Sequence, residues 1–190
     1  IRGMDLSDPE AVFAAMEKSI AKNTSAKAAV DIALYDLMAR IGRVPLYRMI
    51  SRDPLKSRTS LTTDITISVN DTDEMVRDAL RAVSDGYHIL KVKVGKGGEK
   101  DVERVREIRR AVGKEALIRV DANQGWSVQE AVRTIRMMED EGLAIELVEQ
   151  PVSYHDFKGL KAVTREVDTP ILADESVFSY EDAVRIIEEQ

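Results

Sequence analysis

The first sixty residues carry apolar side chains at helical spacing in two successive stretches. We expect one helix over roughly Pro9 to Ala21 and a second over Ser25 to Ile41, which ends before Gly42. Apolar residues three or four positions apart line one face of the second helix: Val30, Leu34, Leu37, Met38 and Ile41. Such faces need another surface on which to pack.

From Leu61 onward, short β-branched runs alternate with amphipathic helical stretches, and Ser127 with Glu130 forms a capping-box pattern before one of these helices. The predicted strands are Leu61 to Val69, Ile89 to Val94, Leu117 to Ala122, Ile145 to Glu149 and Ile171 to Asp174. Five successive βα units predict parallel strands joined by right-handed crossovers, either in a doubly wound sheet or in a (β/α) barrel.

Polar residues on alternate strand positions decide between these two folds. In the second strand, Leu90, Val92 and Val94 share one face while Lys91 and Lys93 share the other. A doubly wound sheet is covered by helices on both faces and leaves few polar residues on either. We therefore predict an α/β chain that forms part of a TIM-like (β/α)7β barrel, whose inner mouth holds a site.

Composition excludes several classes of function. The formal charge is −6, from 28 basic and 34 acidic residues mixed along the chain, which argues against nucleic acid as a partner. The absence of cysteine excludes disulfides, thiol nucleophiles and Cys-ligated metals. No apolar run approaches the roughly 18 residues that span a membrane, and the first residues do not resemble a secretion signal. The simplest interpretation is a cytoplasmic protein that does not bind membranes.

Four chemically active residues stand near the ends of successive predicted strands. Lys93, Asp121, Glu149 and Asp174 are separated by 28, 28 and 25 residues, so we expect them to converge on one mouth. Three carboxylates in one place repel each other, and a divalent cation with a preference for oxygen ligands removes that cost. Mg²⁺ is the predicted ion, with Mn²⁺ as the alternative. A lysine beside a dication and Lys91 has a lowered pKa, which suits a base.

Each of these features has a structural alternative. A single acidic residue at a strand end can cap a helix, Lys-x-Lys can be a solvated edge, and Asp-Ala-Asn can form a turn. Their joint occurrence at matched positions in successive strands favours the catalytic interpretation.

Four motifs resemble one known family. Lys-Val-Lys-Val-Gly from Lys91, Arg-Val-Asp-Ala-Asn-Gln-Gly-Trp from Arg119, Val-Glu-Gln-Pro from Val148 and Leu-Ala-Asp-Glu-Ser from Leu172 are similar to the muconate lactonizing enzyme subgroup of the enolase superfamily. The resemblance implies that residues 1–57 are the C-terminal helical part of a capping domain with its linker. It implies that residues 58–190 are the first five βα units of a catalytic barrel, in a chain truncated at both ends.

The resemblance also implies residue roles. Asp121, Glu149 and Asp174 would bind Mg²⁺, Lys93 would exchange the α-proton of a carboxylate substrate, and Lys91 would be an electrostatic helper. Stabilisation of an enediolate by Mg²⁺ is the established pattern of this superfamily. Two further residues, Asn123 and Glu175, are expected beside the metal ligands.

The first strand points to a reaction. Thr63-Asp64-Ile65-Thr66 looks like the Thr-Asp-x-Thr pattern of dipeptide epimerases, including the L-Ala-D/L-Glu type, in which the second threonine contacts the dipeptide. A structural alternative is that the threonines are present because threonine favours β-strands. We expect a magnesium-dependent isomerase, a racemase or epimerase acting on a dipeptide or another small carboxylate, and a homo-oligomer.

Other functions stay open at this point. Muconate-type cycloisomerases, N-acylamino acid racemases and o-succinylbenzoate synthases share these motifs, and an inactive structural or assembly subunit is the non-enzymatic alternative. The glycine-rich stretch Gly95 to Gly98 would suit a phosphate-binding barrel. The family's second lysine and its ammonium-binding acids would follow Gln190, so we expect residues 1–190 alone to be inactive.

Overall fold

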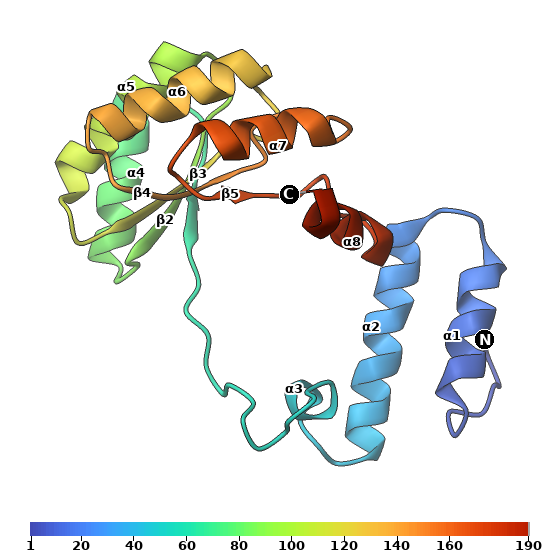
Figure 1. Cartoon of the computed structure of the whole chain (residues 1–190). Coiled ribbons are helices and arrows are strands. Elements are labelled where there is room, and N and C mark those ends of the chain that lie inside the picture. Colours follow the sequence, from blue (N-terminus) through green and yellow to red (C-terminus); the bar gives the residue numbers. More distant parts are fainter. Residues whose placement is uncertain (190) are drawn as a thin grey trace. The chain divides into compact units, whose positions relative to one another are not determined.

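A computed structural model describes residues 1–189. The chain divides into two compact units, Ile1–Leu61 and Thr62–Gln190 (Figure 1). Across the described residues, no helix combines the length and the apolar character that crossing a bilayer requires.

The first unit is helical, as its periodicity predicts. Asp8 caps the first helix by accepting a hydrogen bond from the Ala11 amide, and the rings of Phe13 and Tyr35 stack between the first two helices with centroids 5.1 Å apart. The helices are α1 (Pro9–Ser19), α2 (Thr24–Ile41) and α3 (Leu46–Met49). The first ends two residues earlier than expected.

The second unit is built on a parallel five-stranded sheet. Its strands are β1 (Ile65–Ile67), β2 (Ile89–Lys93), β3 (Leu117–Asp121), β4 (Ile145–Glu149) and β5 (Ile171–Leu172), in the order β1-β2-β3-β4-β5. A doubly wound sheet reverses its strand order at a switch point, whereas a barrel adds strands in sequence. The uninterrupted order confirms the predicted α/β fold with five βα units in barrel order.

A helix follows each strand, and those that follow the first four strands pack against one another in chain order (Figure 1). They are α4 (Thr72–Ser84), α5 (Gly98–Val112), α6 (Val128–Asp140), α7 (Phe157–Glu166) and α8 (Tyr180–Glu189). The predicted capping box of Ser127 and Glu130 is present at the start of α6.

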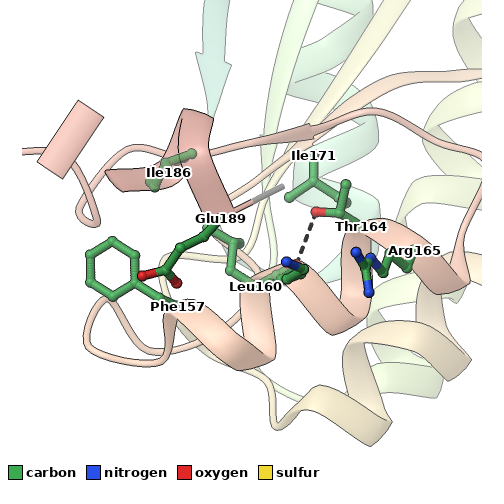
Figure 2. Close-up of a pocket in the computed structure, with 9 residues that line it drawn as sticks. Phe157, Leu160, Thr164, Arg165, Ile171, Ile186 and Glu189 are labelled. Carbon is green, nitrogen blue, oxygen red and sulfur yellow. Dashed lines mark hydrogen bonds between the residues drawn. The ribbon is translucent and has the colours of Figure 1, made fainter. Parts of the chain in front are cut away.

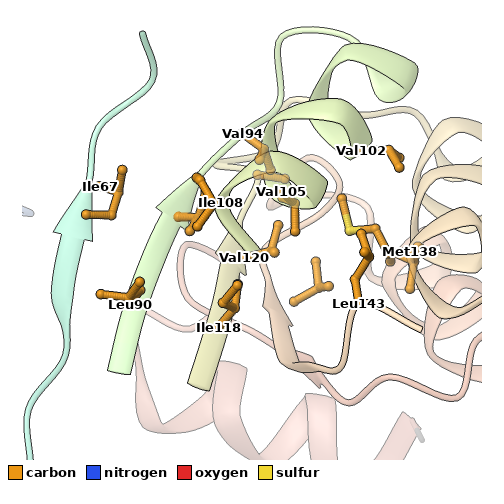
Figure 3. Packing of buried hydrophobic residues seen from close by; sticks show 14 of the residues in the cluster. Ile67, Leu90, Val94, Val102, Val105, Ile108, Ile118, Val120, Met138 and Leu143 are labelled. Atoms are coloured by element: carbon orange, nitrogen blue, oxygen red, sulfur yellow. The ribbon is translucent and has the colours of Figure 1, made fainter. Parts of the chain in front are cut away.

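The core lies between the strands and these helices. Leu90, Val92, Ile118 and Val120 are completely buried on the strand face that meets the helices. Figure 3 shows Leu90, Ile118 and Val120 in this core. Burial of each such side chain contributes about 1.5–3 kcal/mol. The opposite parity carries partly exposed lysines and Arg119, so the predicted division into an apolar and a charged face is confirmed.

Both edge strands are shorter than the sequence predicts, and those two predictions are wrong. The first was expected over Leu61 to Val69, but only Ile65–Ile67 pair with β2. The last was expected to reach Asp174, but its pairing with β4 ends at Leu172. Each edge strand has one neighbour among the described strands. The Asp174 backbone amide donates to the Gln150 side chain and not to a neighbouring strand.

One irregularity interrupts the sheet interior. Ile118 pairs with Ile145 but Arg119 pairs with Leu147, so Glu146 forms a bulge in β4. The bulged Glu146 accepts a hydrogen bond from Arg119 Nε at 2.6 Å.

Candidate functional site

The sheet register sets the predicted residues in a row. Lys93 is the cross-strand partner of Asp121, and Asp121 is the partner of Glu149. Glu149 in turn pairs with Leu172, two residues before Asp174. All four positions therefore lie at the carboxyl end of the sheet, which is where catalytic groups of this barrel type sit.

Lysine ammonium groups lie between the buried carboxylates. Lys93 Nζ is 2.6 Å from Asp121 Oδ2, and Lys91 Nζ is 3.0 Å from the same oxygen and 2.7 Å from Glu149 Oε1. The Asp121 side chain is completely buried and that of Glu149 is 9% exposed. Two cations thus offset the charge of two carboxylates that would otherwise be costly to desolvate.

The loop after β3 extends this network. Lys93 Nζ donates to Asn123 Oδ1 at 2.7 Å, and Asn123 Nδ2 donates to Glu175 Oε1 at 3.2 Å. The Asn123 backbone amide also donates to Asp121 Oδ1 at 2.9 Å. The other oxygen of Glu175 is buried without a hydrogen-bond partner. Asn123 therefore links the lysine, the buried aspartate and the turn after β5.

The electrostatic environment differs from one group to the next. Burial raises the pKa of Glu149, and the negative charges of Asp121 and Asp174 raise it further against the opposing effect of Lys91. Burial also favours a raised pKa for Asp121, but hydrogen bonds from Lys93, Lys91 and the Asn123 amide outweigh it and lower the pKa. Desolvation lowers the pKa of Lys91, yet its two carboxylate partners hold that pKa above its ordinary value.

The donor set fits a hard divalent cation. The three carboxylates supply only oxygen ligands, and the negative charges of Asp121 and Asp174 add to the effect of burial in raising the pKa of Glu149. Within residues 1–189, no group of three or more acidic or histidine side chains is arranged to hold a metal ion. The ammonium groups of Lys91 and Lys93 supply the counter-charge in this arrangement.

Two predicted residues stand apart from the buried network. Asp174 is exposed at the turn after β5, where its backbone amide donates to Gln150 Oε1 at 2.9 Å. Thr66 is exposed on β1, but it is the cross-strand partner of Lys91 and so adjoins the row of charged residues.

Two positioning residues were not predicted from the sequence. The Asp101 carboxylate accepts hydrogen bonds from the Gly95, Lys96 and Gly97 amides and from the Trp126 indole. Gln150 is likewise completely buried. Asp101 follows Glu99 and Lys100 at the start of a helical stretch, and Gln150 follows Glu149 in a recognised motif. No local pattern therefore marked either residue as buried.

The same contacts bear on the phosphate alternative. The backbone amides of Gly95, Lys96 and Gly97, which a phosphate would need, all point to one oxygen of Asp101 at 3.0–3.1 Å. The glycine-rich loop therefore already binds an anion, supplied by its own helix.

A separate pocket of about 240 Å³ lies between α7 and α8. Figure 2 shows Phe157, Leu160, Ile171 and Ile186 around it, with Thr164 Oγ donating to the Leu160 carbonyl at 2.9 Å. None of the predicted metal ligands or lysines lines this pocket. The candidate site therefore lies at the strand ends and not in this pocket.

Fold and site together define part of a (β/α) barrel that carries lysines and carboxylates at the carboxyl ends of its strands. Family models match nearly the whole chain: residues 1–51 match the mandelate racemase / muconate lactonizing enzyme N-terminal domain and residues 74–190 match the enolase C-terminal domain-like family. The chain belongs to the mandelate racemase / muconate lactonizing enzyme family of the enolase superfamily.

Relatives and solved structures agree with this membership. The chain is 53% identical over 188 residues to an L-Ala-D/L-Glu epimerase of Clostridium acetobutylicum, covering 99% of this chain and 51% of that protein. It superposes with a TM-score of 0.94 and 47% identity on a substrate-liganded L-Ala-D/L-Glu epimerase of Bacillus subtilis, covering 98% of this chain and 51% of that one.

A third similar protein has a solved structure that contains a metal ion. A dipeptide epimerase of Enterococcus faecalis, complexed with Mg and the dipeptide L-Leu-L-Tyr, matches with a TM-score of 0.92 and 41% identity, covering 98% of this chain and 51% of that one. The chain spans about half the length of the curated relatives it matches.

Proposed function

We propose that the intact protein is a magnesium-dependent dipeptide epimerase. The single observation that carries this proposal is the row Lys93, Asp121 and Glu149, which places Lys93 beside the buried Asp121 and Asp121 beside the buried Glu149 at the carboxyl end of the barrel sheet. The similarity to dipeptide epimerases supports the substrate class.

In this proposal Asp121, Glu149 and Asp174 bind Mg²⁺. When bound, the ion stabilises the negative charge that develops on the substrate carboxylate as its α-proton leaves. In the structure, the ammonium groups of Lys91 and Lys93 supply the counter-charge to Asp121.

Lys93 would take the α-proton at Nζ once its contact with Asp121 is released. Asn123, 2.7 Å from Nζ, would hold the amine while it changes protonation state, because an amide oxygen accepts from both forms. Lys91 would add positive charge next to the developing enediolate. Thr66 would contact the dipeptide from β1, and Glu175 would hold Asn123.

Several predictions from the sequence stay predictions here. Residues 1–57 and 58–190 would be the end of the capping domain and the first part of the barrel. The second acid/base lysine would lie outside these residues, so the segment alone would be inactive. A homo-oligomer in the cytoplasm is the expected form. Three alternative activities are muconate-type cycloisomerase, N-acylamino acid racemase and o-succinylbenzoate synthase. Assays of the purified protein with the substrate of each would distinguish them from dipeptide epimerisation.

The test is α-proton exchange. In the intact protein, Asp121→Asn and Glu149→Gln should each lower Mg²⁺-dependent exchange of a dipeptide α-proton with deuterated solvent by about 10³-fold or more, measured by proton NMR. Glu103→Gln, the same chemical change at an exposed position on α5, should leave the exchange rate unaltered. Exchange retained in both site variants would contradict the proposed ligands, and an intact protein that binds no Mg²⁺ in calorimetry would favour the non-enzymatic alternative.

A further inference from the structure

One residue of the Glu-Gln-Pro motif has no part in the proposed chemistry. Gln150 follows directly after Glu149 at the end of β4, and its side chain is completely buried. A buried amide needs a partner for every donor and acceptor it carries, or it destabilises the fold.

The Gln150 side chain meets that requirement fully, and three of its four hydrogen bonds go to the turn that carries Asp174. Its Oε1 accepts from the Asp174 amide at 2.9 Å and from the Ser176 amide at 3.1 Å. Its Nε2 donates to Ser176 Oγ at 2.8 Å and to the Val152 carbonyl at 3.0 Å. Both lone pairs and both protons of the amide are therefore used.

The backbone of Gln150 makes two more links. Its amide donates to the Leu172 carbonyl at 2.9 Å, and its carbonyl accepts from the Gln124 amide at 2.8 Å. Leu172 is the last residue of β5, and Gln124 lies in the loop after β3. Gln150 thus joins the ends of the three strands on which Asp121, Glu149 and Asp174 stand.

The backbone conformation points to a constrained position. Gln150 has φ +36°, in the left-handed region that a side chain other than glycine seldom adopts. Such a conformation persists only where surrounding interactions fix it. The six hydrogen bonds of Gln150 are those interactions, and they leave Asp174 with a defined backbone position although its side chain is exposed.

We propose that Gln150 is a positioning residue that sets the Asp174 carboxylate relative to Asp121 and Glu149, and so sets the affinity of the site for Mg²⁺. This inference rests on the proposed function, because it gives Asp174 a metal to bind. Residues that hold metal ligands in place change metal affinity by about 10–100-fold when they are removed.

The test measures Mg²⁺ binding directly, by isothermal titration calorimetry on the intact protein without substrate. Gln150→Met keeps the length of the side chain but removes all four of its hydrogen bonds, and it should raise the Kd for Mg²⁺ by at least about 10-fold. If that variant does not fold, Gln150→Asn withdraws the amide by one methylene and should raise the Kd in the same direction.

Two control variants separate positioning from stability. Ser176→Ala removes the hydroxyl partner of Gln150 Nε2 but keeps the Asp174 amide on Oε1, so it should lower the melting temperature and leave the Kd within about 2-fold. Thr134→Val changes a completely buried hydroxyl on α6 and should leave the Kd unaltered.

The outcomes are distinct. An unchanged Kd in a folded Gln150 variant, or an equal rise in Ser176→Ala, overturns the positioning role while the proposed function stands. A wild-type protein that binds no Mg²⁺ overturns both. A rise confined to the Gln150 variants supports the inference.

Discussion

At the scale of single residues, Asp101 holds together two loops that flank the site. It is completely buried, its Oδ2 accepts from the loop after β2 and from the Trp126 indole, and its Oδ1 accepts from Arg104 at 2.9 Å. The two loops also lie in close contact, since a Cβ on Gly95 would clash with the Ala122 carbonyl oxygen. A substitution that shifts these loops should therefore also shift the ends of β2 and β3, which carry Lys93 and Asp121.

Asp101→Asn should lower the free energy of unfolding by about 2–3 kcal/mol. The substitution replaces hydrogen bonds to a charged carboxylate with bonds to a neutral amide, and the new NH₂ group would face hydrogen-bond donors where an oxygen now accepts. Urea denaturation followed by circular dichroism measures this. Glu99→Gln, an exposed change in the same helical turn, should stay within about 0.5 kcal/mol of the wild type. Equal stabilities of the two variants would contradict the role of Asp101.

At the scale of elements, the capping box shows how α6 begins. Ser127 Oγ accepts from the Glu130 amide at 3.3 Å, and Glu130 Oε2 accepts from the Ser127 amide at 3.1 Å. These two bonds satisfy donors that the first helical turn would otherwise leave free. Because α6 follows the loop that holds Asn123, its start also limits where that loop can lie.

The capping box gives a pH dependence. The hydrogen bond from the Ser127 amide lowers the pKa of Glu130 below its ordinary value of 4.5. The stabilisation is therefore complete above that value and is lost as the pH falls through the lowered pKa. Glu130→Gln should melt below the wild type at pH 7, and the difference in melting temperature should shrink by pH 3. A difference that grows on acidification would contradict this assignment.

At the scale of the whole barrel unit, an ion network crosses the sheet beneath the site. Arg119 on β3 binds Glu146 on β4 through Nε and Asp64, next to β1, through Nη1 at 3.1 Å. The Glu146 bulge makes the first contact available. Since Asp64 precedes a strand of only three residues, this ion pair is one of the ties that hold β1 in the sheet.

Arg119→Met should lower the free energy of unfolding by about 1–2 kcal/mol, because the pairs are partly exposed and screened by solvent. Hydrogen exchange of the Ile65–Ile67 amides should become faster than in the wild type, as measured by mass spectrometry. Arg110→Met, which breaks an exposed pair on α5, should change neither quantity appreciably. Unaltered exchange in β1 would show that Arg119 does not hold that strand.

The order and type of the elements and the two faces of the strands follow from local patterns in the sequence. Alternation of apolar and polar residues is a local property, since backbone geometry fixes the direction of each side chain. Equal spacing of Lys93, Asp121 and Glu149 in successive βα units then predicted a common height, and the register makes them neighbours.

Which side chains contact one another depends on the assembled fold. The contact of Lys91 with Glu149 spans 58 residues, and the contact of Gln150 with Asp174 spans 24. The bulge at Glu146 and the early end of β5 likewise depend on packing between strands. No local pattern specifies such pairs, because a buried polar group accepts whichever partner the assembled fold brings within hydrogen-bond distance.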